Sequence, residues 1–301
     1  MINRQVMVLM STFNGEKYVS NQLDSILNQT YENMKIHIRD DGSTDHTVDI
    51  LRQYEQQGKI VLEAGENIGL IRSFHWLVEN CEKSDYYSFA DQDDEWNADK
   101  VERAVHSLDK TGQSIPALYF CDFDYYDCDL NFLYHKKPLK RELHFLVTLS
   151  SIVNYGFTTV INDELRKLFM QMPADAVFGH DYLALLIASA FGSIYYDTAR
   201  CAKYRRHGKT ASISGAGFIK LSIWRIKNVL FKDNFRYKDK WAQFYSVYND
   251  ILSEDIKSKL VWFASRYRVD YAFKKALYPR RYRETFFDEI AIRVLFLLGR
   301  L

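Results

Sequence analysis

Short apolar runs alternate with helical hydrophobic patterns over about the first 125 residues of the chain. A continuous apolar run such as "VMVLMSTF" is typical of a strand buried on both faces, whereas apolar residues three or four positions apart indicate a helix. Tyr18, Leu23, Ile26 and Leu27 form such a helical stripe after the first run. The pattern predicts strands at residues 6–13, 35–41, 59–65, 86–91 and 117–123, and helices at residues 16–29, 45–57, 68–81 and 97–108.

This order predicts an α/β fold with a mainly parallel central sheet flanked by helices, because such strands are joined by right-handed crossovers. Asp45 is placed to cap the second helix. The pattern is less regular from residue 130 to 215, where we expect strands at 154–161 and 193–206 and helices at 163–169 and 179–191. Beyond it, apolar, aromatic and basic residues recur at helical spacing. We therefore expect one domain over residues 1–215 and a C-terminal helical region over residues 216–301.

The distribution of charge also divides the chain into an N-terminal and a C-terminal region. The net charge is only +1, but residues 1–199 have a net charge of −13 and residues 200–301 a net charge of +14. This asymmetry predicts that the two regions have different partners. No segment resembles a known nucleic-acid-reading motif, so nucleic acid is not an expected partner.

Cysteine spacing and hydropathy restrict the class further. Cys81, Cys121, Cys128 and Cys201 lack the C-x-x-C spacing of zinc sites, so we expect free thiols in a reducing compartment. The N-terminal apolar run is too short for a signal peptide. No uncharged apolar run approaches the roughly 18 residues of a transmembrane helix. These features predict a cytoplasmic protein that does not span a membrane.

Polar residues collect where the predicted strands end, in "STFNGE", "DDGSTD", "GENIG" and "DQDD". Ligands of open parallel sheets bind in the crevice beyond the carboxyl ends of the strands. Ser11 and Thr12 could contact a pyrimidine base there, and Asp41 could bind a ribose hydroxyl or a base N–H. Arg72, near the start of the helix after "GENIG", suits a phosphate.

The stretch "YYSFADQDDEW" begins as a buried strand and ends in Asp91, Asp93 and Asp94. Unpaired carboxylates repel one another and are costly to desolvate. Oxygen ligands suit Mg²⁺ or Mn²⁺, and Mg²⁺ is usually held by one or two carboxylates together with substrate phosphates. The alternative is a solvated acidic turn that caps the following helix.

The motifs "STFNGEKYVSNQLDSILNQTY", "DDGSTDHT", "ENIGLIRSF", "DQDD" and "GHD", in this order, resemble those of the family 2 glycosyltransferases over about residues 4–215. The resemblance implies the A-type, Rossmann-like nucleotide-sugar fold, a nucleotide-diphospho-sugar donor, and Mn²⁺ or Mg²⁺. It implies that Asp41 binds the nucleoside, that Asp91 binds the ribose or the metal, and that Asp93 binds the metal. Gln92, between them, belongs to the expected donor site.

An inverting transfer also needs a base that deprotonates the acceptor hydroxyl. The family has an acid at the place of "GHD", which implies that Asp181 is this base; the alternative is a helix N-cap. His180 could orient Asp181 or contact the acceptor. Asp94 is expected beside the acceptor or behind the site, and Trp96 could line the acceptor pocket or anchor the next helix.

A histidine after the second half of the fold often completes the metal or diphosphate site of related enzymes, which implies this role for His207 in "YRRHG"; the alternative is a basic surface loop. "ADQDDEW", "GHD" and "YRRHG" together are similar to bacterial rhamnosyltransferases, which implies dTDP-L-rhamnose as donor and a saccharide acceptor in a cell-wall or capsular polysaccharide. Hexosyltransferases that use UDP-sugars share the same core motifs. A non-catalytic nucleotide-sugar-binding subunit is the alternative from another class.

The basic, aromatic C-terminal region could lie on an anionic membrane surface. A lipid-linked acceptor at the inner face of the plasma membrane would give that position a purpose. The alternatives are a helical subdomain packed on the catalytic core and a homodimer contact.

Overall fold

The computed structural model describes residues 3–111, 114–175, 178–207, 237–265, 267–283 and 286–299. The chain forms two compact units. The first contains Met1–Pro138 and Ile152–Arg206, and the second contains Leu139–Ser151 and His207–Leu301. The predicted boundary between residues 215 and 216 lies outside the described residues.

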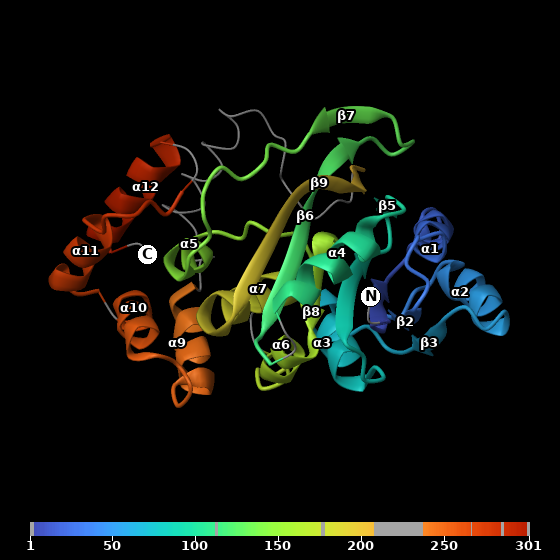
Figure 1. Cartoon of the computed structure of the whole chain (residues 1–301), viewed down its shortest axis with the longest axis horizontal. Coiled ribbons are helices and arrows are strands. Elements are labelled where there is room, and N and C mark those ends of the chain that lie inside the picture. Colours follow the sequence, from blue (N-terminus) through green and yellow to red (C-terminus); the bar gives the residue numbers. More distant parts are fainter. Residues whose placement is uncertain are drawn as a thin grey trace. The chain divides into compact units, whose positions relative to one another are not determined.

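The first unit is built on one nine-stranded sheet (Figure 1). The strand order is β3-β2-β1-β4-β8-β6-β9-β5, with β7 paired to β6. The strands are β1 (Val6–Thr12), β2 (Met34–Asp40), β3 (Val61–Ala64), β4 (Tyr86–Asp91), β5 (Glu95–Trp96), β6 (Ala117–Tyr126), β7 (Phe132–His135), β8 (Thr159–Asn162) and β9 (Ser193–Arg205).

The predicted α/β fold is confirmed, and its sheet is mixed. β1 runs parallel to both β2 and β4, β2 runs parallel to β3, and β6 runs parallel to β9. β8 is antiparallel to its neighbours β4 and β6, β5 is antiparallel to β9, and β7 is antiparallel to β6. Between β6 and β8 the chain passes through a segment of the second unit and returns to the sheet in the opposite direction. The strand predicted at 154–161 instead begins with a 3₁₀ turn, η2 (Gly156–Thr158).

Helices cover both faces of this sheet. Alternate residues of β1, such as Val8 and Met10, belong to the core beneath α1, α2 and α4, whereas α3, α6 and α7 lie on the other face. The first unit has the helices α1 (Val19–Leu27), α2 (Thr47–Gln56), α3 (Leu70–Asn80), α4 (Lys100–Leu108), α6 (Asp163–Phe169) and α7 (His180–Phe191), and the 3₁₀ turn η1 (Asp109–Thr111). α2 begins at Thr47 with His46 as its N-cap residue, so the predicted cap, Asp45, lies one residue too early, although its carboxylate accepts a hydrogen bond from the N–H of Thr47 at 3.0 Å.

The second unit is helical in its described part. Its core is aromatic: Trp241 packs edge-on against Phe263 at 5.1 Å between ring centroids, and Tyr282 packs against Phe296 at the same distance. Among the described residues, no helix is long and apolar enough to span a membrane. The helices are α5 (Phe145–Ser150), α9 (Tyr237–Tyr248), α10 (Glu254–Ala264), α11 (Val269–Ala276) and α12 (Phe286–Leu297).

Candidate active site

The strand register brings the polar strand ends together at one edge of the sheet. Ser11 of β1 lies opposite Arg39 of β2 on one side and opposite Asp91 of β4 on the other, and Thr12 lies opposite Asp40. The crevice predicted from the sequence therefore has its residues side by side.

Asp40 organises the turn after β2. Its carboxylate accepts hydrogen bonds from the hydroxyls of Thr12 (2.8 Å) and Ser43 (2.6 Å) and from the N–H of Ser43 (2.8 Å). Gly42 has a φ of 81°, which only glycine adopts without strain. The Thr12 hydroxyl thus uses its proton within the protein, so it could take part in a base contact only as an acceptor.

Asp41 joins β2 to the start of α3. Its carboxylate is buried, pairs with the Arg39 guanidinium at 2.5 Å, and accepts the N–H groups of Ile68 (2.8 Å) and Gly69 (2.9 Å). Arg39 also donates to Ser73, which in turn shares a hydrogen bond of 2.7 Å with Ser11. The predicted nucleoside contact of Asp41 therefore competes with a structural role that uses most of its acceptor sites.

The acid loop, residues 91–94, follows β4 at this edge. Asp91 is partly exposed, yet the low polarity of its surroundings raises the pKa of its carboxyl group to about 7, and the neighbouring charges of Asp93 and Asp181 add to the increase. The sheet topology thus brings the carboxylates of "DQDD" and of "GHD" within electrostatic reach of each other, although they are far apart in the sequence.

Gln92 has a different place from the one expected of a donor ligand. Its amide clamps the backbone of Phe13, accepting from the N–H at 2.9 Å and donating to the carbonyl at 3.0 Å. A Cβ at Gly15 would lie 2.2 Å from Oε1 of Gln92, so the glycine makes room for this clamp. The aromatic side chain of Phe13, 46% exposed, is thereby held beside the crevice, and the sequence analysis missed it.

Asp94 faces inward, away from any acceptor. It is fully buried, and Oδ1 accepts the backbone N–H of Arg205 at 3.0 Å. Burial raises its pKa well above the ordinary value, and the charges of Asp93 and Asp91 act in the same direction. Arg205, at the end of β9, also donates through Nε to the carbonyl of Asp93 (2.8 Å) and through Nη1 to that of Cys128 (2.9 Å). Asp94 and Arg205 therefore shape the acid loop from beneath.

Trp96 is also internal. It is 3% exposed, and the ammonium of the buried Lys100 lies 3.3 Å from its ring centroid. This geometry matches the anchoring alternative rather than contact with an acceptor, because the side chain ties β5 to the first turn of α4.

His180 and Asp181 open α7, and they differ in exposure. The buried His180 imidazole packs against Phe74 and Phe89 at 3.8 and 4.8 Å between ring centroids, and burial lowers its pKa. Its Nε2 has no hydrogen-bond partner among the described residues. Asp181 is partly exposed, and its carbonyl accepts from Nδ2 of Asn154 at 3.0 Å. Asp181 is therefore the member of the pair that a ligand can reach, while His180 packs behind it.

Two predicted site residues remain, Arg72 and His207. Arg72 is an exposed residue in the first turn of α3. His207 is half-buried and belongs to the second unit, so its role as a metal or diphosphate ligand stays a prediction.

We next ask whether the residues of the acid loop could hold a metal ion. No group of three or more histidine, cysteine, aspartate or glutamate side chains in this part of the chain is arranged to hold a metal ion. The acid loop nevertheless offers Asp91 and Asp93, whose like charges raise the pKa of Asp91. A divalent cation would relieve that repulsion, and two carboxylates suffice for a Mg²⁺ that substrate phosphates also ligate. The donor set therefore fits a cation held jointly with a diphosphate.

Comparison with known proteins defines the family. Residues 7–169 match the model of glycosyl transferase family 2, so the chain belongs to this family. It is 27% identical over 208 residues to an uncharacterised glycosyltransferase of Rickettsia typhi, covering 67% of this chain and 64% of the relative. It is 33% identical over 105 residues to the dTDP-rhamnosyl transferase RfbG of Shigella flexneri, covering 33% of this chain and 36% of the relative. The chain thus spans less than two thirds of the length of these relatives.

Solved structures agree with the fold. Residues 1–349 of TarS from S. aureus superpose with a TM-score of 0.60 at 14% identity, covering 98% of this chain and 79% of that one. The mannosyltransferase PcManGT of Pyrobaculum calidifontis, solved with GDP-Man and Mn²⁺, gives a TM-score of 0.54 at 14% identity, covering 99% and 86%. At this identity the likeness supports the A-type glycosyltransferase fold alone.

Proposed function

We propose that the protein is a metal-dependent, inverting glycosyltransferase that moves a sugar from a nucleotide-diphospho-sugar to a saccharide hydroxyl. One observation carries the proposal: the fold places Asp91, at the carboxyl end of β4, opposite Ser11 of β1 and within electrostatic reach of both Asp93 and Asp181. Family membership and the nucleotide-sugar complex of PcManGT support the same reading.

We assign Asp181 as the base that deprotonates the acceptor hydroxyl. The acceptor oxygen forms a bond to the anomeric carbon while the bond from that carbon to the diphosphate oxygen breaks, and the hydroxyl proton passes to the Asp181 carboxylate. A cation bound by Asp91 and Asp93 would offset the charge that develops on the diphosphate. The clamp of Gln92 on Phe13 and the Asp41–Arg39 pair hold the donor side of the crevice in place.

The favoured donor is dTDP-L-rhamnose, and the favoured acceptor is a growing cell-surface polysaccharide. The likeness to RfbG, a dTDP-rhamnosyl transferase, supports this choice over one third of the chain. A UDP-sugar donor is the alternative, because the site residues are assigned to the nucleotide and diphosphate that these donors have in common rather than to the sugar.

The test is a screen of nucleotide sugars for binding and hydrolysis with Mn²⁺, with Mg²⁺ and with excess chelator. We expect metal-dependent turnover that is highest with dTDP-L-rhamnose. Metal-dependent turnover of a UDP-sugar instead would retain the enzyme and change the donor. Nucleotide-sugar binding without any turnover would favour a non-catalytic subunit.

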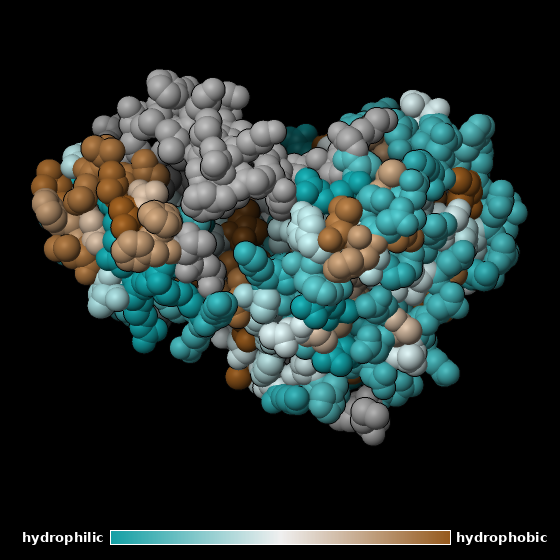
Figure 2. Space-filling model, turned by 90° about the horizontal axis from the view of Figure 1, so that it is seen from above, coloured by the Kyte–Doolittle hydropathy of each residue, from teal (hydrophilic) through white to brown (hydrophobic). Residues whose placement is uncertain are grey.

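We further propose that α11 and α12 place the protein at an anionic membrane surface. Figure 2 shows hydrophobic residues gathered on the part of the molecule that carries these helices. The side chains of Phe286 and Phe287 in α12 are 65% and 71% exposed, and Leu277, directly after α11, is 75% exposed. Lys274 and Lys275 lie in the last turn of α11, and three arginines (Arg280, Arg281 and Arg283) lie between the two helices, and such basic residues attract a helix to anionic headgroups. A lipid-linked acceptor would be met there.

A further inference from the structure

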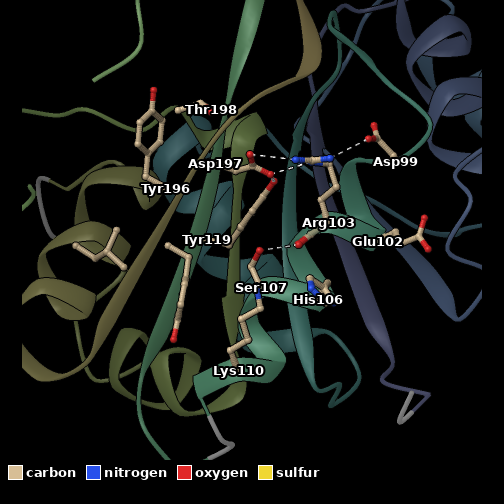
Figure 3. Close-up of a pocket in the computed structure, with 12 residues that line it drawn as sticks. Asp99, Glu102, Arg103, His106, Ser107, Lys110, Tyr119, Tyr196, Asp197 and Thr198 are labelled. Carbon is tan, nitrogen blue, oxygen red and sulfur yellow. Dashed lines mark hydrogen bonds and ion pairs between the residues drawn. The ribbon is translucent and has the colours of Figure 1, made fainter. Parts of the chain in front are cut away.

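A groove of about 940 Å³ lies in the first unit, between α4 and the beginning of β9 (Figure 3). One wall consists of α4 residues spaced three or four apart, which places them along one face of the helix. Ile194 to Thr198 of β9 form the other wall. Its volume falls within the range of small-molecule and oligomer sites, roughly 300–1,000 Å³.

The floor of the groove is a closed polar network. Arg103 donates from Nε and Nη2 to the two carboxylate oxygens of Asp197, at 2.8 and 3.2 Å, and the Tyr119 hydroxyl donates to Asp197 at 3.0 Å. Burial alone would raise the pKa of Asp197, but the hydrogen bonds from Arg103, from the N–H of Ala199 and from Tyr119 lower it below the ordinary value. The floor is therefore rigid, and its charges are internally neutralised.

The rim, in contrast, keeps unused polar groups. His106, Lys110 and Thr198 make no side-chain hydrogen bond within the described part of the chain, and all three are exposed. The Ser107 hydroxyl donates to the carbonyl of Arg103 at 2.9 Å, which leaves its lone pairs able to accept. Both donors and acceptors thus line the groove (Figure 3).

An aromatic side chain and an open strand edge complete the site. Tyr195 is half-buried in the wall on the α4 side of β9, where its hydroxyl accepts a hydrogen bond from Thr111 at 2.7 Å. Tyr196, the next residue of the strand, points to the opposite face of the sheet, where it stacks on Phe120 at 5.0 Å between ring centroids. In the described sheet, β9 pairs with β5 only at Ala202 and Lys203, so the outer edge of the earlier part of β9 has no strand partner. Its backbone N–H and C=O groups are available to a ligand.

This chemistry selects the ligand class. The acids Asp99 and Glu102 lie at the beginning of α4 and Lys110 follows its end, so no single sign of charge dominates the rim. A phosphate-rich ligand would meet these carboxylates. An uncharged chain of hydroxylated rings matches this mixture of donors and acceptors and can lie against the ring of Tyr195. Asp99, which lines one end of the groove, follows the acid loop closely in the sequence.

We propose that this groove is a second carbohydrate site, which holds a segment of the acceptor saccharide away from the acid loop. The inference rests on the proposed function, because it assumes that the acceptor is a saccharide long enough to reach from one site to the other. It gives the groove the role of retaining a growing chain between transfers.

The test is binding of the full chain to an array of bacterial polysaccharides and their hexasaccharide fragments. The variant His106→Ala/Lys110→Ala removes two unused donors, and Ser107→Trp fills the groove from α4. Lys137→Ala, an exposed lysine outside the groove, is the matched control. We expect the wild type and the control to bind the same glycans, the double variant to bind at least about fivefold more weakly, as for one lost hydrogen bond or more, and the filled variant to lose binding.

Kinetics separate this inference from the proposed function. With a long acceptor, the groove variants should raise KM and leave kcat within twofold; hydrolysis of the donor should not change. The inference is overturned if both groove variants bind glycans like the wild type, or if the wild type turns over donor but binds no glycan. If the protein bound glycans through the groove but turned over no nucleotide sugar, the proposed enzymatic function would be wrong and the groove would still be a carbohydrate site.

Discussion

The backbone N–H of Arg205 donates to Oδ1 of the buried Asp94 at 3.0 Å, which ties the end of β9 to the acid loop. The Arg205 side chain strengthens this link through the carbonyl of Asp93, and its guanidinium lies 4.7 Å from the ring centroid of Tyr18. Asp94 is therefore a structural carboxyl group, whereas Asp91 and Asp93 are partly exposed. The predictions below build on this division of roles.

Asp41→Asn should destabilise the first unit. The neutral amide would leave the buried Arg39 guanidinium without its counter-ion and would weaken the bonds to the start of α3, and breaking a buried pair from one side typically costs about 3–5 kcal/mol. Urea unfolding measures the change in the free energy of unfolding. Asp49→Asn, at a 73% exposed carboxylate paired with His46, is the control and should change stability by less than about 1 kcal/mol. Equal effects of the two variants would contradict the structural role of Asp41.

Lys100→Met should stabilise the protein at neutral pH. Burial lowers the pKa of Lys100 from 10.5 to about 8. The unfolded chain therefore binds more protons than the folded protein between pH 8 and 10.5, so the wild type gains stability as the pH rises through that window. The shift corresponds to about 3 kcal/mol below pH 8.

The measurement is the difference in unfolding free energy between Lys100→Met and the wild type from pH 7 to 10.5. We expect the advantage of the variant to shrink steadily above pH 8. A difference that stays constant across this range would show that the ammonium is not destabilised in the folded protein.

Asp181→Asn should separate chemistry from binding. Loss of a positioned general base typically reduces turnover by about 10²–10⁴-fold, while the donor contacts at β1, β2 and β4 remain. Single-turnover kinetics and donor titration give the two quantities. His180→Phe should keep the packing against Phe74 and Phe89 and preserve most of the turnover. If donor affinity fell together with turnover in Asp181→Asn, the base would have to be sought elsewhere.

Part of this site could be predicted from the sequence because it is local. Each strand end carries its own polar motif, and a parallel register places such ends at one edge, so the proximity of Ser11, Asp41 and Asp91 follows from pattern alone. The clamp of Gln92 on Phe13 and the link from Arg205 to Asp94 join segments distant in the sequence, and no local pattern specifies such contacts. The same limit applies to β8, where four residues after a 3₁₀ turn enter the sheet antiparallel, and to His180, whose burial depends on the packing of α3 against α7.

Phe286→Ser/Phe287→Ser should abolish sedimentation with anionic vesicles. Two exposed aromatic rings contribute apolar area to the headgroup region, and the basic balance of the C-terminal region adds an attraction that salt screens over about 10 Å at 0.1 M. Wild type should bind anionic vesicles but not neutral ones. Phe132→Ser/Leu133→Ser, at apolar side chains of the first unit that are 49% and 46% exposed, is the matched control.

That control should bind like the wild type. Absence of wild-type binding to anionic vesicles at low salt, or a stable dimer that buries α12, would make this surface an assembly contact instead.

The acid loop allows the most direct test of the central claim, because two neighbouring aspartates are predicted to differ. Isothermal titration of a nucleotide-diphospho-sugar with Mn²⁺ should be made on Asp93→Asn and Asp94→Asn. In Asp93→Asn a neutral amide cannot balance the cation, so Mn²⁺-dependent donor binding and transfer should be lost. Asp94 is buried and its Oδ1 accepts the backbone N–H of Arg205, a bond that an amide oxygen can also accept, so Asp94→Asn should stay within about tenfold of the wild type. Full activity of Asp93→Asn, or of the wild type in excess chelator, would contradict the assignment of a metal-dependent transferase.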